Sequence, residues 1–312
     1  MKKVITVTLN PAFDLHCASE SFEARRENYV TPLSSEAGGK GVNISRALLV
    51  SGIESLAFVV LGRDNGERFE RLLEIDGIKY IPFYTDGSIR ENITVHTVND
   101  TETRISLDSF ALSEATFKQL CEGLSKVADS ETVISLSGRI PRGISKEKII
   151  DFLKELTKLG AKLVIDSNSF SASDLARIRP YLIKPNAEEI TALVGREVGT
   201  ASDALSIARE LVANNTAERV MISLGASGAV YASDTLTATV SVPMISPVST
   251  IGAGDSTVAG YIAAMLDSLC EADCLRLAAA YGCAACLTEG TRPPERETIS
   301  KLYGKINVDI LN

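Results

Sequence analysis

The sequence has no tryptophan and only two histidines, His16 and His96. A Ser-His-Asp hydrolase needs a histidine as its general base, so this scarcity argues against that class of enzyme. The sequence also has no uninterrupted apolar run of about 18 residues, and a membrane-spanning helix is therefore not expected. The apolar run in MKKVITVTLNPAFD is too short for a signal peptide, and we predict that it forms the first strand of a cytoplasmic protein.

Cysteine occurs six times, but nothing else in the sequence indicates a secreted, disulfide-linked protein. Cys283 and Cys286 have the CxxC spacing of zinc and redox sites. They lie, however, in the alanine-rich segment AAAYGCAACL, which has the composition of a buried helix, and no second CxxC motif accompanies them. We therefore interpret them as buried thiols rather than as zinc ligands or a redox pair.

Basic residues are in the minority, since 32 lysines and arginines stand against 40 aspartates and glutamates, for a formal net charge of −8. This balance argues against nucleic acid or an anionic membrane surface as a partner. An anionic ligand would need a site that is locally basic. The 312 residues, 45% of them hydrophobic, are enough for a large buried core.

Strand-like and helix-like segments alternate along most of the chain. Strands are expected at KVITVTL, SLAFVVLG, TVISLS, AKLVIDS, YLIKPN, RVMISLG and AVYAS. Helices are expected at GVNISRALLVSG, RFERLLEIDG, SEATFKQLCEGLSKVA, SKEKIIDFLKELTKLG, NAEEITALVG, ASDALSIARELVAN and at 253–269, 271–287 and 295–306. Alternation with nearly continuous apolar strands predicts an α/β protein of three layers, with a mostly parallel central sheet between helices.

Two stretches depart from this alternation. Residues 22–35 and 78–110 have the pattern of short β-type pieces separated by turn residues, including a hairpin turn at 99–102. We predict that they form a small accessory sheet, a lid, on a single domain that spans residues 1–312.

The segment IGAGDSTVAG places Gly252, Ala253 and Gly254 before Asp255 at the start of a predicted helix. Backbone N–H groups at such a turn, together with the positive end of the helix dipole, stabilise a phosphoryl group or an oxyanion. Asp255 would then accept a proton from a nucleophile that meets this group. Alternatively, Asp255 only stabilises the helix N-terminus. The segment alone leaves both interpretations open.

A second glycine cluster, EAGGKGVN, also opens a predicted helix and contains Gly38, Gly39, Lys40 and Asn43. It lacks the G-x-G-x-x-G spacing of dinucleotide-binding folds and the GxxxxGK[ST] spacing of the P-loop. One lysine and one asparagine in a glycine-rich turn suit a polyhydroxylated ligand. Taken alone, such a segment is more often a plain turn before a helix.

Three further polar segments follow predicted strands. In VISLSGRIPRG, Gly138 and Arg139 follow a buried strand, and Asp14 comes shortly after the first strand, where ligands of open α/β sheets collect. In KPNAEEITALVG, Asn186 and Glu189 share one face of a helix, where they either contact a ligand or form an ordinary helix cap. SLGASGAV supplies a glycine-containing turn between two strands.

The motifs GGKGVN, SGRIP, KPNAEE, SLGASG and GAGD occur in this order, and together they resemble the ribokinase-like (PfkB) carbohydrate kinases over essentially the whole chain. NPAFD with GGKGVN is similar to the branch of the family that acts on hexose phosphates. The resemblance implies a ribokinase-like α/β/α fold with a β lid, and a kinase that uses ATP and Mg²⁺. Phosphoryl transfer needs positioning and charge stabilisation, which an anion hole, a metal ion and one base supply.

The resemblance also implies a role for each matching residue. Asp255 matches the catalytic base, and Gly252, Ala253 and Gly254 match the anion hole. The sugar is expected at Asp14, Gly38, Gly39, Lys40, Asn43, Arg90, Gly138 and Arg139, with the two arginines on its existing phosphate. The nucleotide and Mg²⁺ are expected at Lys184, Asn186, Glu189, Ser223, Gly225, Gly228, Ala280 and Cys283, with Glu189 acting on the metal through water.

The expected reaction is the ATP-dependent phosphorylation of a ketohexose phosphate, first of all of fructose 1-phosphate to fructose 1,6-bisphosphate. Tagatose 6-phosphate, fructose 6-phosphate and then an unphosphorylated sugar or nucleoside are the alternatives. A nicotinamide-dependent oxidoreductase and a non-catalytic sugar-phosphate sensor are rivals from other classes. The lid is expected to close over the sugar and to form a homodimer interface. Ser249 stands where the family often has an aspartate that helps to hold a monovalent cation.

Overall fold

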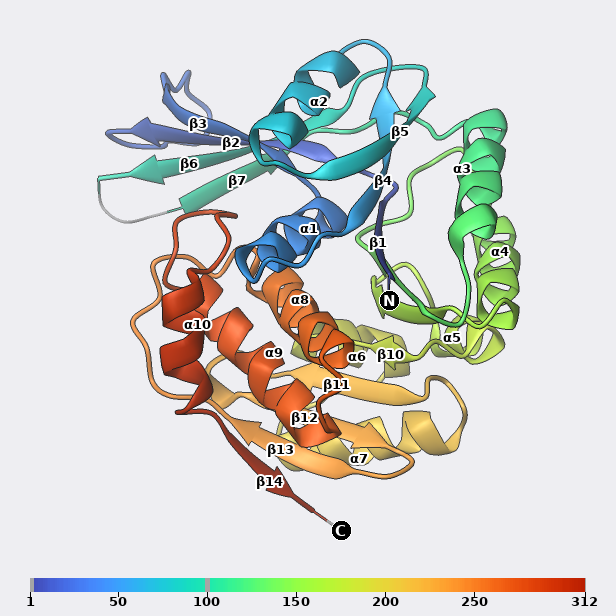
Figure 1. Cartoon of the computed structure of the whole chain (residues 1–312). Coiled ribbons are helices and arrows are strands. Elements are labelled where there is room, and N and C mark those ends of the chain that lie inside the picture. The colour runs from blue at the N-terminus through green and yellow to red at the C-terminus, as the bar shows by residue number, and fades with distance from the viewer. Residues whose placement is uncertain (1–2, 99–101, 312) are drawn as a thin grey trace.

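The computed structural model describes residues 3–98 and 102–311. A large sheet of ten strands lies between two layers of helices, and a sheet of four strands projects from one side (Figure 1). Among the described residues, no helix has the length and apolar character that crossing a membrane would require. The α/β class and the three-layer, ribokinase-like architecture predicted from the sequence are confirmed.

The large sheet has the strand order β14-β13-β12-β11-β10-β9-β8-β1-β4-β5. Its strands are β1 (Lys3–Thr8), β4 (Leu56–Gly62), β5 (Lys79–Thr85), β8 (Thr132–Ser137), β9 (Lys162–Asp166), β10 (Leu182–Ile183), β11 (Arg219–Ser223), β12 (Ala229–Ser233), β13 (Thr237–Ser241) and β14 (Asn307–Ile310). All pairs from β5 to β11 are parallel, and the pairs from β11 to β14 are antiparallel. The parallel strands therefore bring the residues that follow them to one edge of the sheet.

Alternate residues of the central strands face two different hydrophobic cores. In β8, Ile134 and Leu136 face one core, and Val133 faces the other. The first core is closed by α2 (Gly66–Ile75), α3 (Glu114–Val127), α4 (Lys146–Lys158), α5 (Ala172–Ile178), α6 (Ala187–Val194) and α7 (Ala201–Ala213). The second is closed by α1 (Lys40–Val50), α8 (Ala253–Leu266), α9 (Glu271–Ala285) and α10 (Arg296–Tyr303). Burial on both faces explains why the strands are almost continuously apolar.

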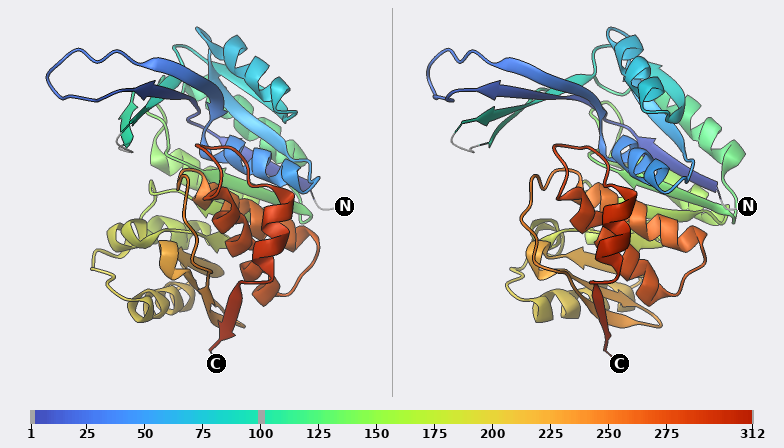
Figure 2. Two further views of the ribbon diagram at one scale, coloured as in Figure 1. Left: turned by 90° about the vertical axis from the view of Figure 1, so that its left-hand side faces the viewer. Right: turned by 60° about the vertical axis from the view of Figure 1, so that its left-hand side comes forward.

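The small sheet has the strand order β3-β2-β6-β7 and stands out from the body of the molecule (Figure 2). It consists of β2 (Ala12–Ser19), β3 (Thr31–Gly38), β6 (Arg90–Thr97) and β7 (Glu102–Ser106). β2 pairs with β6 in parallel, and the other two pairs are antiparallel. The pairing of β6 with β7 agrees with the predicted hairpin, although residues 99–101 of its turn lie outside the described residues.

The boundaries of this sheet differ from the predicted lid. Lys79–Thr85 pairs with β4 along its whole length and forms the edge of the large sheet. Ala12–Ser19 leaves the large sheet directly after β1 and joins the small one, whereas residues 22–30 form no strand. β13 and β14 were also not expected. The alternation of apolar residues indicates a strand, but it does not say with which strand it pairs.

Candidate active site

The two glycine clusters open two helices that lie side by side, α1 and α8 (Figure 1). The residue before α1 is Gly39 with φ 116°, and the residue before α8 is Gly252 with φ 75°. Both values lie in the left-handed region, which a residue with a side chain rarely adopts. Glycine therefore lets the chain turn sharply into each helix at the edge of the sheet.

Asp255 is the third residue of α8 and is only 6% exposed. It does not cap its own helix; instead, the amide of Asn43 in α1 donates a hydrogen bond to Asp255 Oδ2 over 2.8 Å. Burial raises the pKa of Asp255 to about 7, against the effect of Lys40. A carboxyl group that changes protonation state near neutral pH is suited to accept a proton from a hydroxyl group.

A buried cluster of opposite charges lies next to Asp255. Asp166, which ends β9, is 1% exposed. Its carboxylate lies 3.1 Å from Lys40 Nζ and 3.7 Å from Lys184 Nζ. Burial alone would lower the pKa of Lys40, but Asp166, Asp255 and Glu189 together raise it. Lys40 therefore carries its positive charge beside the carboxyl group of Asp255.

The first turn of α8 is open toward a ligand. No side chain caps it, so its first backbone N–H groups have no partner within the helix. A Cβ atom on Gly254 would lie 3.3 Å from Lys184 Nζ, which places that ammonium group directly at the turn. Unpaired N–H groups, a helix dipole and a buried cation together form an anion site.

The segment before α6 forms a helix cap at the border of the charged cluster. Asn186 Oδ1 accepts from the N–H of Glu189 at 2.8 Å, and Glu189 Oε2 accepts from the N–H of Asn186 at 2.9 Å. This is a capping box, so the ordinary interpretation of these two residues is correct for their local structure. The other oxygen of Glu189 lies 3.8 Å from Lys40 Nζ and thus borders the charged cluster.

The small sheet contributes a second polar group. Asn92 of β6 donates to Asp14 Oδ1 of β2 over 2.8 Å, and burial raises the pKa of Asp14. A Cβ atom on Gly38 would come within 2.0 Å of the Asp14 carboxylate, so this close approach requires glycine. Arg90 belongs to the same sheet, and burial lowers its pKa, an effect that Asp14 opposes and Arg139 increases. The two arginines are thus near enough to repel each other.

The predicted nucleotide residues lie in two places. Ser223 ends β11 next to Asn186, and Gly225 follows it with φ 60° and open space on its Cβ side. Gly228 is required for packing, because a Cβ atom there would lie 1.9 Å from the carbonyl oxygen of Val240. The others are in α9: Cys283 is a half-buried free thiol, whereas Ala280 is completely buried against the second core and offers no surface to a nucleotide.

Several residues of this site were not predicted from the sequence. Asp166 and Asn92 were not singled out, and neither was Arg46, which binds Asn43. A signal existed for Asp166, since it ends a buried apolar strand at the edge where ligands collect. Asn92 and Arg46 have no such signal, because their roles depend on residues in other elements. Gly138, with φ 97°, lies beside Lys40, since a Cβ atom there would be 3.9 Å from Lys40 Cβ.

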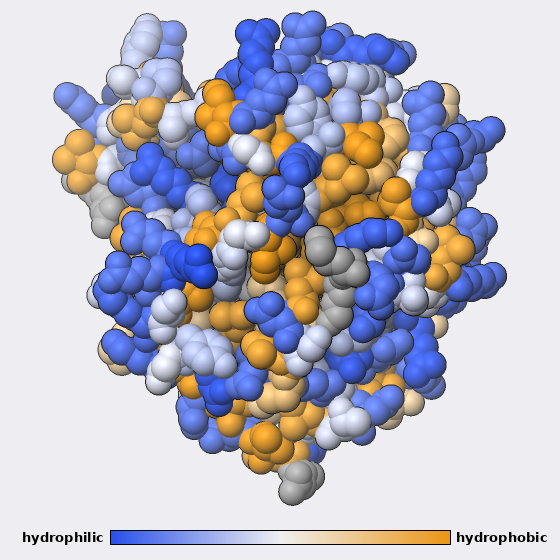
Figure 3. Space-filling model, viewed as in Figure 1, coloured by the Kyte–Doolittle hydropathy of each residue, from blue (hydrophilic) through white to orange (hydrophobic). Residues whose placement is uncertain are grey.

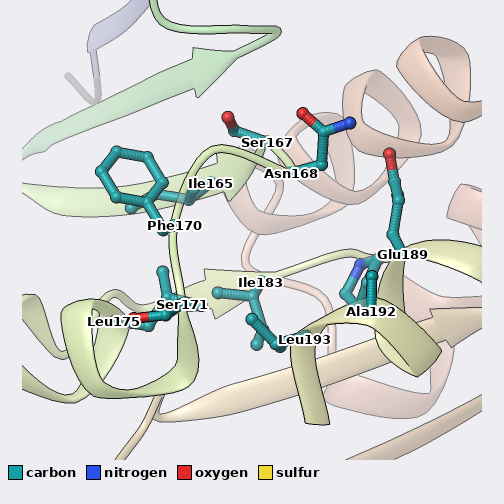
Figure 4. Close-up of a pocket in the computed structure, with 11 residues that line it drawn as sticks. Ile165, Ser167, Asn168, Phe170, Ser171, Leu175, Ile183, Glu189, Ala192 and Leu193 are labelled. Atoms are coloured by element: carbon teal, nitrogen blue, oxygen red, sulfur yellow. The ribbon is translucent and has the colours of Figure 1, made fainter. Parts of the chain in front are cut away.

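A cavity of about 120 Å³ lies next to the site, between the ends of β9 and β10 and the helices α5 and α6 (Figure 4). Its lining is largely apolar and includes Ile165, Phe170, Ile183 and Leu193. Glu189 stands at its rim with its carboxylate directed away from these side chains (Figure 4). Asp255 does not line the cavity. The cavity is therefore adjacent to the charged cluster, and the cluster does not lie inside it.

Known proteins resemble this chain over nearly its full length. The pfkB family of carbohydrate kinases matches residues 1–298. The 1-phosphofructokinase of Vibrio cholerae serotype O1 is 31% identical over 310 residues, 99% of this chain and 98% of that protein. The ATP-dependent 6-phosphofructokinase isozyme 2 of Escherichia coli K12 is 29% identical over 309 residues, 98% of this chain and 100% of that protein.

The solved structures agree with these relatives. Phosphofructokinase-2 from Escherichia coli in complex with substrates and products is similar with a TM-score of 0.90 and 29% identity, over 97% of this chain and 99% of that one. The tetrameric inhibited form of the same enzyme is similar with a TM-score of 0.89 and 27% identity, over 98% of this chain and 99% of that one.

Proposed function

This chain belongs to the pfkB family of carbohydrate kinases, and on that basis we propose that it transfers the γ-phosphoryl group of ATP to fructose 1-phosphate, giving fructose 1,6-bisphosphate and ADP. One observation carries the proposal: a buried carboxyl group, Asp255, is held by Asn43 beside an uncapped helix N-terminus and the ammonium group of Lys184. A base and an anion site are thereby placed at one point. Phosphoryl transfer requires that combination.

In the proposed reaction each group has one step. The sugar hydroxyl oxygen forms a bond to the γ-phosphorus while the bond from that phosphorus to the departing ADP oxygen breaks. Asp255 takes the hydroxyl proton. The N–H groups of Ala253 and Gly254, with Lys184, stabilise the negative charge on the transferring group. Because Asp255 must be deprotonated, we expect activity to rise with pH through the region of pH 7.

The residues present fit ATP and Mg²⁺. The open first turn of α8 and Lys184 suit the terminal phosphates, and the open space beside Gly225 leaves room for the rest of the nucleotide. Glu189 would act on Mg²⁺ through water, with the oxygen that faces Lys40. When bound, the ion neutralises charge on the phosphate oxygens.

A phosphosugar is favoured by the arginine pair. The net charge of −8 repels an anionic substrate, so its phosphate needs local cations. Arg90 and Arg139 repel each other, and a phosphate between them would relieve this repulsion. Each charge-assisted contact contributes about 1.5–3 kcal/mol. Asp14, fixed by Asn92, would accept hydrogen bonds from sugar hydroxyl groups.

A second candidate substrate is fructose 6-phosphate. It is favoured by the similarity to the Escherichia coli 6-phosphofructokinase isozyme 2, at 29% identity. Both substrates give the same bisphosphate, but the attacking hydroxyl is on carbon 6 of fructose 1-phosphate and on carbon 1 of fructose 6-phosphate.

The test is ADP release with Mg-ATP and a panel of acceptors: fructose 1-phosphate, tagatose 6-phosphate, fructose 6-phosphate, fructose, ribose and adenosine. We expect kcat/KM for fructose 1-phosphate to exceed every other value by at least about tenfold, which corresponds to about 1.4 kcal/mol of additional transition-state stabilisation. A preference for fructose 6-phosphate would select the second candidate. Turnover of unphosphorylated compounds only would overturn the role of Arg90 and Arg139, and no turnover at all would favour the sensor.

We also propose that the small sheet forms a homodimer interface. Tyr29, Leu33 and Val98, on this sheet and its connections, are 81%, 62% and 80% exposed. Hydrophobic side chains reach the surface of the projecting sheet, at the upper left of Figure 3. Exposed apolar clusters of this kind mark interaction sites. Sedimentation velocity of the wild type and of Leu33→Asp tests the interface. We expect the wild type to have twice the monomer mass and Leu33→Asp to have the monomer mass; equal masses would refute the interface.

Because ATP and phosphosugars are held in the cytoplasm, we propose that the enzyme is located there.

A further inference from the structure

Arg46 is a buried cation that lies three residues after Asn43 in α1, and therefore on the same face of the helix. Each of the three nitrogens of its guanidinium group donates at least one hydrogen bond. Nη1 donates to Asn43 Oδ1 at 3.0 Å, and Nη2 donates to the carbonyl oxygen of Ala37 at 2.5 Å. Nε and Nη2 both donate to Asp76 Oδ2, at 3.0 and 2.6 Å. Asp76 ends α2, so Arg46 connects α1, α2 and the end of β3.

These contacts determine which way the side-chain amide of Asn43 points. An asparagine amide has one accepting atom and one donating atom, whereas a guanidinium group only donates. The atom of Asn43 that faces Arg46 must therefore be the oxygen. The amide nitrogen is then directed to the other side, where it donates to Asp255 Oδ2 at 2.8 Å. A flipped amide would place two donors together at Arg46 and two acceptors together at Asp255.

We propose that Arg46, anchored by Asp76, is a positioning residue that holds the Asn43 amide in the orientation that donates to Asp255. The inference rests on the proposed function, because only there is Asp255 the base. Arg46 does not touch the substrate in this scheme; it acts through Asn43. Without Arg46 the amide rotates, and its oxygen spends part of the time against the carboxylate.

The charged groups around Asp255 have contacts of their own, separate from those of Arg46. Lys40 from α1, Asp166 from β9 and Lys184 after β10 act on it through charge. They are held by one another, at 3.1 Å for Lys40 to Asp166 and 3.7 Å for Lys184 to Asp166. Arg46 does lower the pKa of Asp14, so a substitution there is also expected to raise KM for the sugar. The diagnostic quantities are therefore kcat and its pH dependence.

The test is a double-mutant cycle of Arg46→Met and Asn43→Ala, with kcat measured from pH 5.5 to 9 under saturating substrates. We expect Arg46→Met alone to lower kcat about tenfold. It should also move the acid limb of the profile of kcat against pH by about half a unit to higher pH, because the charged form of Asp255 loses a hydrogen bond. In the Asn43→Ala background, Arg46→Met should change kcat by less than about twofold. Equal factors in both backgrounds would overturn the inference.

A matched control separates positioning from plain stability. Arg219 forms a comparable ion pair with Glu271 at 3.0 Å, at the opposite end of β11 from Ser223. We expect Arg219→Met to lower the unfolding temperature without moving the acid limb. If Arg46→Met moved only the unfolding temperature as well, its role would be structural. If Arg46→Met does not fold, Asp76→Asn, which keeps an acceptor for Arg46, should move the acid limb in the same direction by a smaller amount, and an unmoved limb would count against the inference.

A readout independent of turnover distinguishes failure of this inference from failure of the proposed function. The pKa of Asp255 is measured by NMR of side-chain carboxyl carbons in ¹³C-labelled protein, with its signal assigned by its loss in Asp255→Asn. We expect a higher pKa in Arg46→Met than in the wild type. An inactive wild type with this shift would refute the proposed function alone. An active wild type without the shift would refute the positioning role alone.

Discussion

The helices α6 and α8 both carry an acidic residue at their third position, Glu189 and Asp255, and use it in opposite ways. Glu189 folds back onto the backbone N–H of Asn186 and closes its own helix. Asp255 leaves the first turn of α8 open and accepts a hydrogen bond from Asn43, in another helix. The same residue type at the same helix position is a cap in one case and a candidate base in the other.

An uncapped N-terminus alone does not mark a site, because a side-chain cap is present at α3 to α7 but absent at α1, α2, α8, α9 and α10. Capping boxes close α5 with Ser171 and Asp174, and α7 with Thr200 and Asp203. An uncapped N-terminus costs about 1 kcal/mol relative to a capped one. In the proposed function, the N–H groups that remain open at α8 are the ones that bind the phosphate. An open helix end beside a buried carboxyl group therefore marks the active site more reliably than either feature alone.

The largest effect is expected when the acid of α8 is removed. Asp255→Asn keeps the size and the hydrogen bond from Asn43 but cannot accept a proton, so kcat should fall by at least about 10²-fold. Asp203→Asn makes the same change at the third position of α7 and should leave kcat unaltered. Steady-state kinetics of both proteins test this, and near-wild-type turnover by Asp255→Asn would remove Asp255 as the base.

A smaller effect is expected when the open turn of α8 is partly filled. The methyl group of Gly254→Ala would lie 3.3 Å from Lys184 Nζ and would intrude into the anion site. We expect kcat/KM for ATP to fall about tenfold, since a phosphate contact is weakened. Gly304→Ala adds a methyl group where no atom lies within 4 Å and serves as the control. Equal values of kcat/KM for both variants would show that phosphate does not bind at this turn.

A few-fold effect is expected from the acid of α6. Glu189→Gln can still accept from the N–H of Asn186, so the cap and the unfolding temperature should be preserved, whereas the negative charge beside Lys40 is lost. We expect the Mg²⁺ concentration for half-maximal activity to rise about threefold or more, as carboxylates are preferred by this ion. The measurement is a Mg²⁺ titration of activity. An unchanged titration would mean that Glu189 is a cap and nothing more.

The smallest expected effect concerns stability. The folded-state pKa of Asp255, about 7, lies above its ordinary value of 3.8. Its favourable contribution is therefore complete below about pH 4 and is lost as the pH rises through 7. Asp255→Asn should unfold ~2 °C or more above the wild type at pH 8, and this difference should shrink toward pH 4. Thermal unfolding monitored by circular dichroism across this pH range tests the sign. A variant that is less stable at pH 8 would contradict the burial cost.

Predictions from the sequence were correct where they depended on local pattern. The strands KVITVTL and TVISLS and the two glycine-opened helices are present where expected. Predictions that depended on which segments pair or pack together were less accurate. IKYIPFY has the pattern of a strand in either sheet, and only its pairing with β4 assigned it to the large one. The family resemblance implied a nucleotide contact at Ala280, but the packing of α9 buries this residue completely.

The sequence by itself determined the alternation of strands and helices, the sharp turns at Gly39 and Gly252, and the presence of Asp255 at a helix start. These features depend on residues only a few positions apart, so their dihedral preferences and apolar spacing can be determined directly from the sequence. The tertiary structure alone determined the burial and the hydrogen-bond partner of Asp255. Asn43, which binds it, lies 212 residues away, and Arg46 fixes that amide only because α1 packs against the end of α2. Burial, charge and hydrogen-bond direction are set by partners distant in sequence.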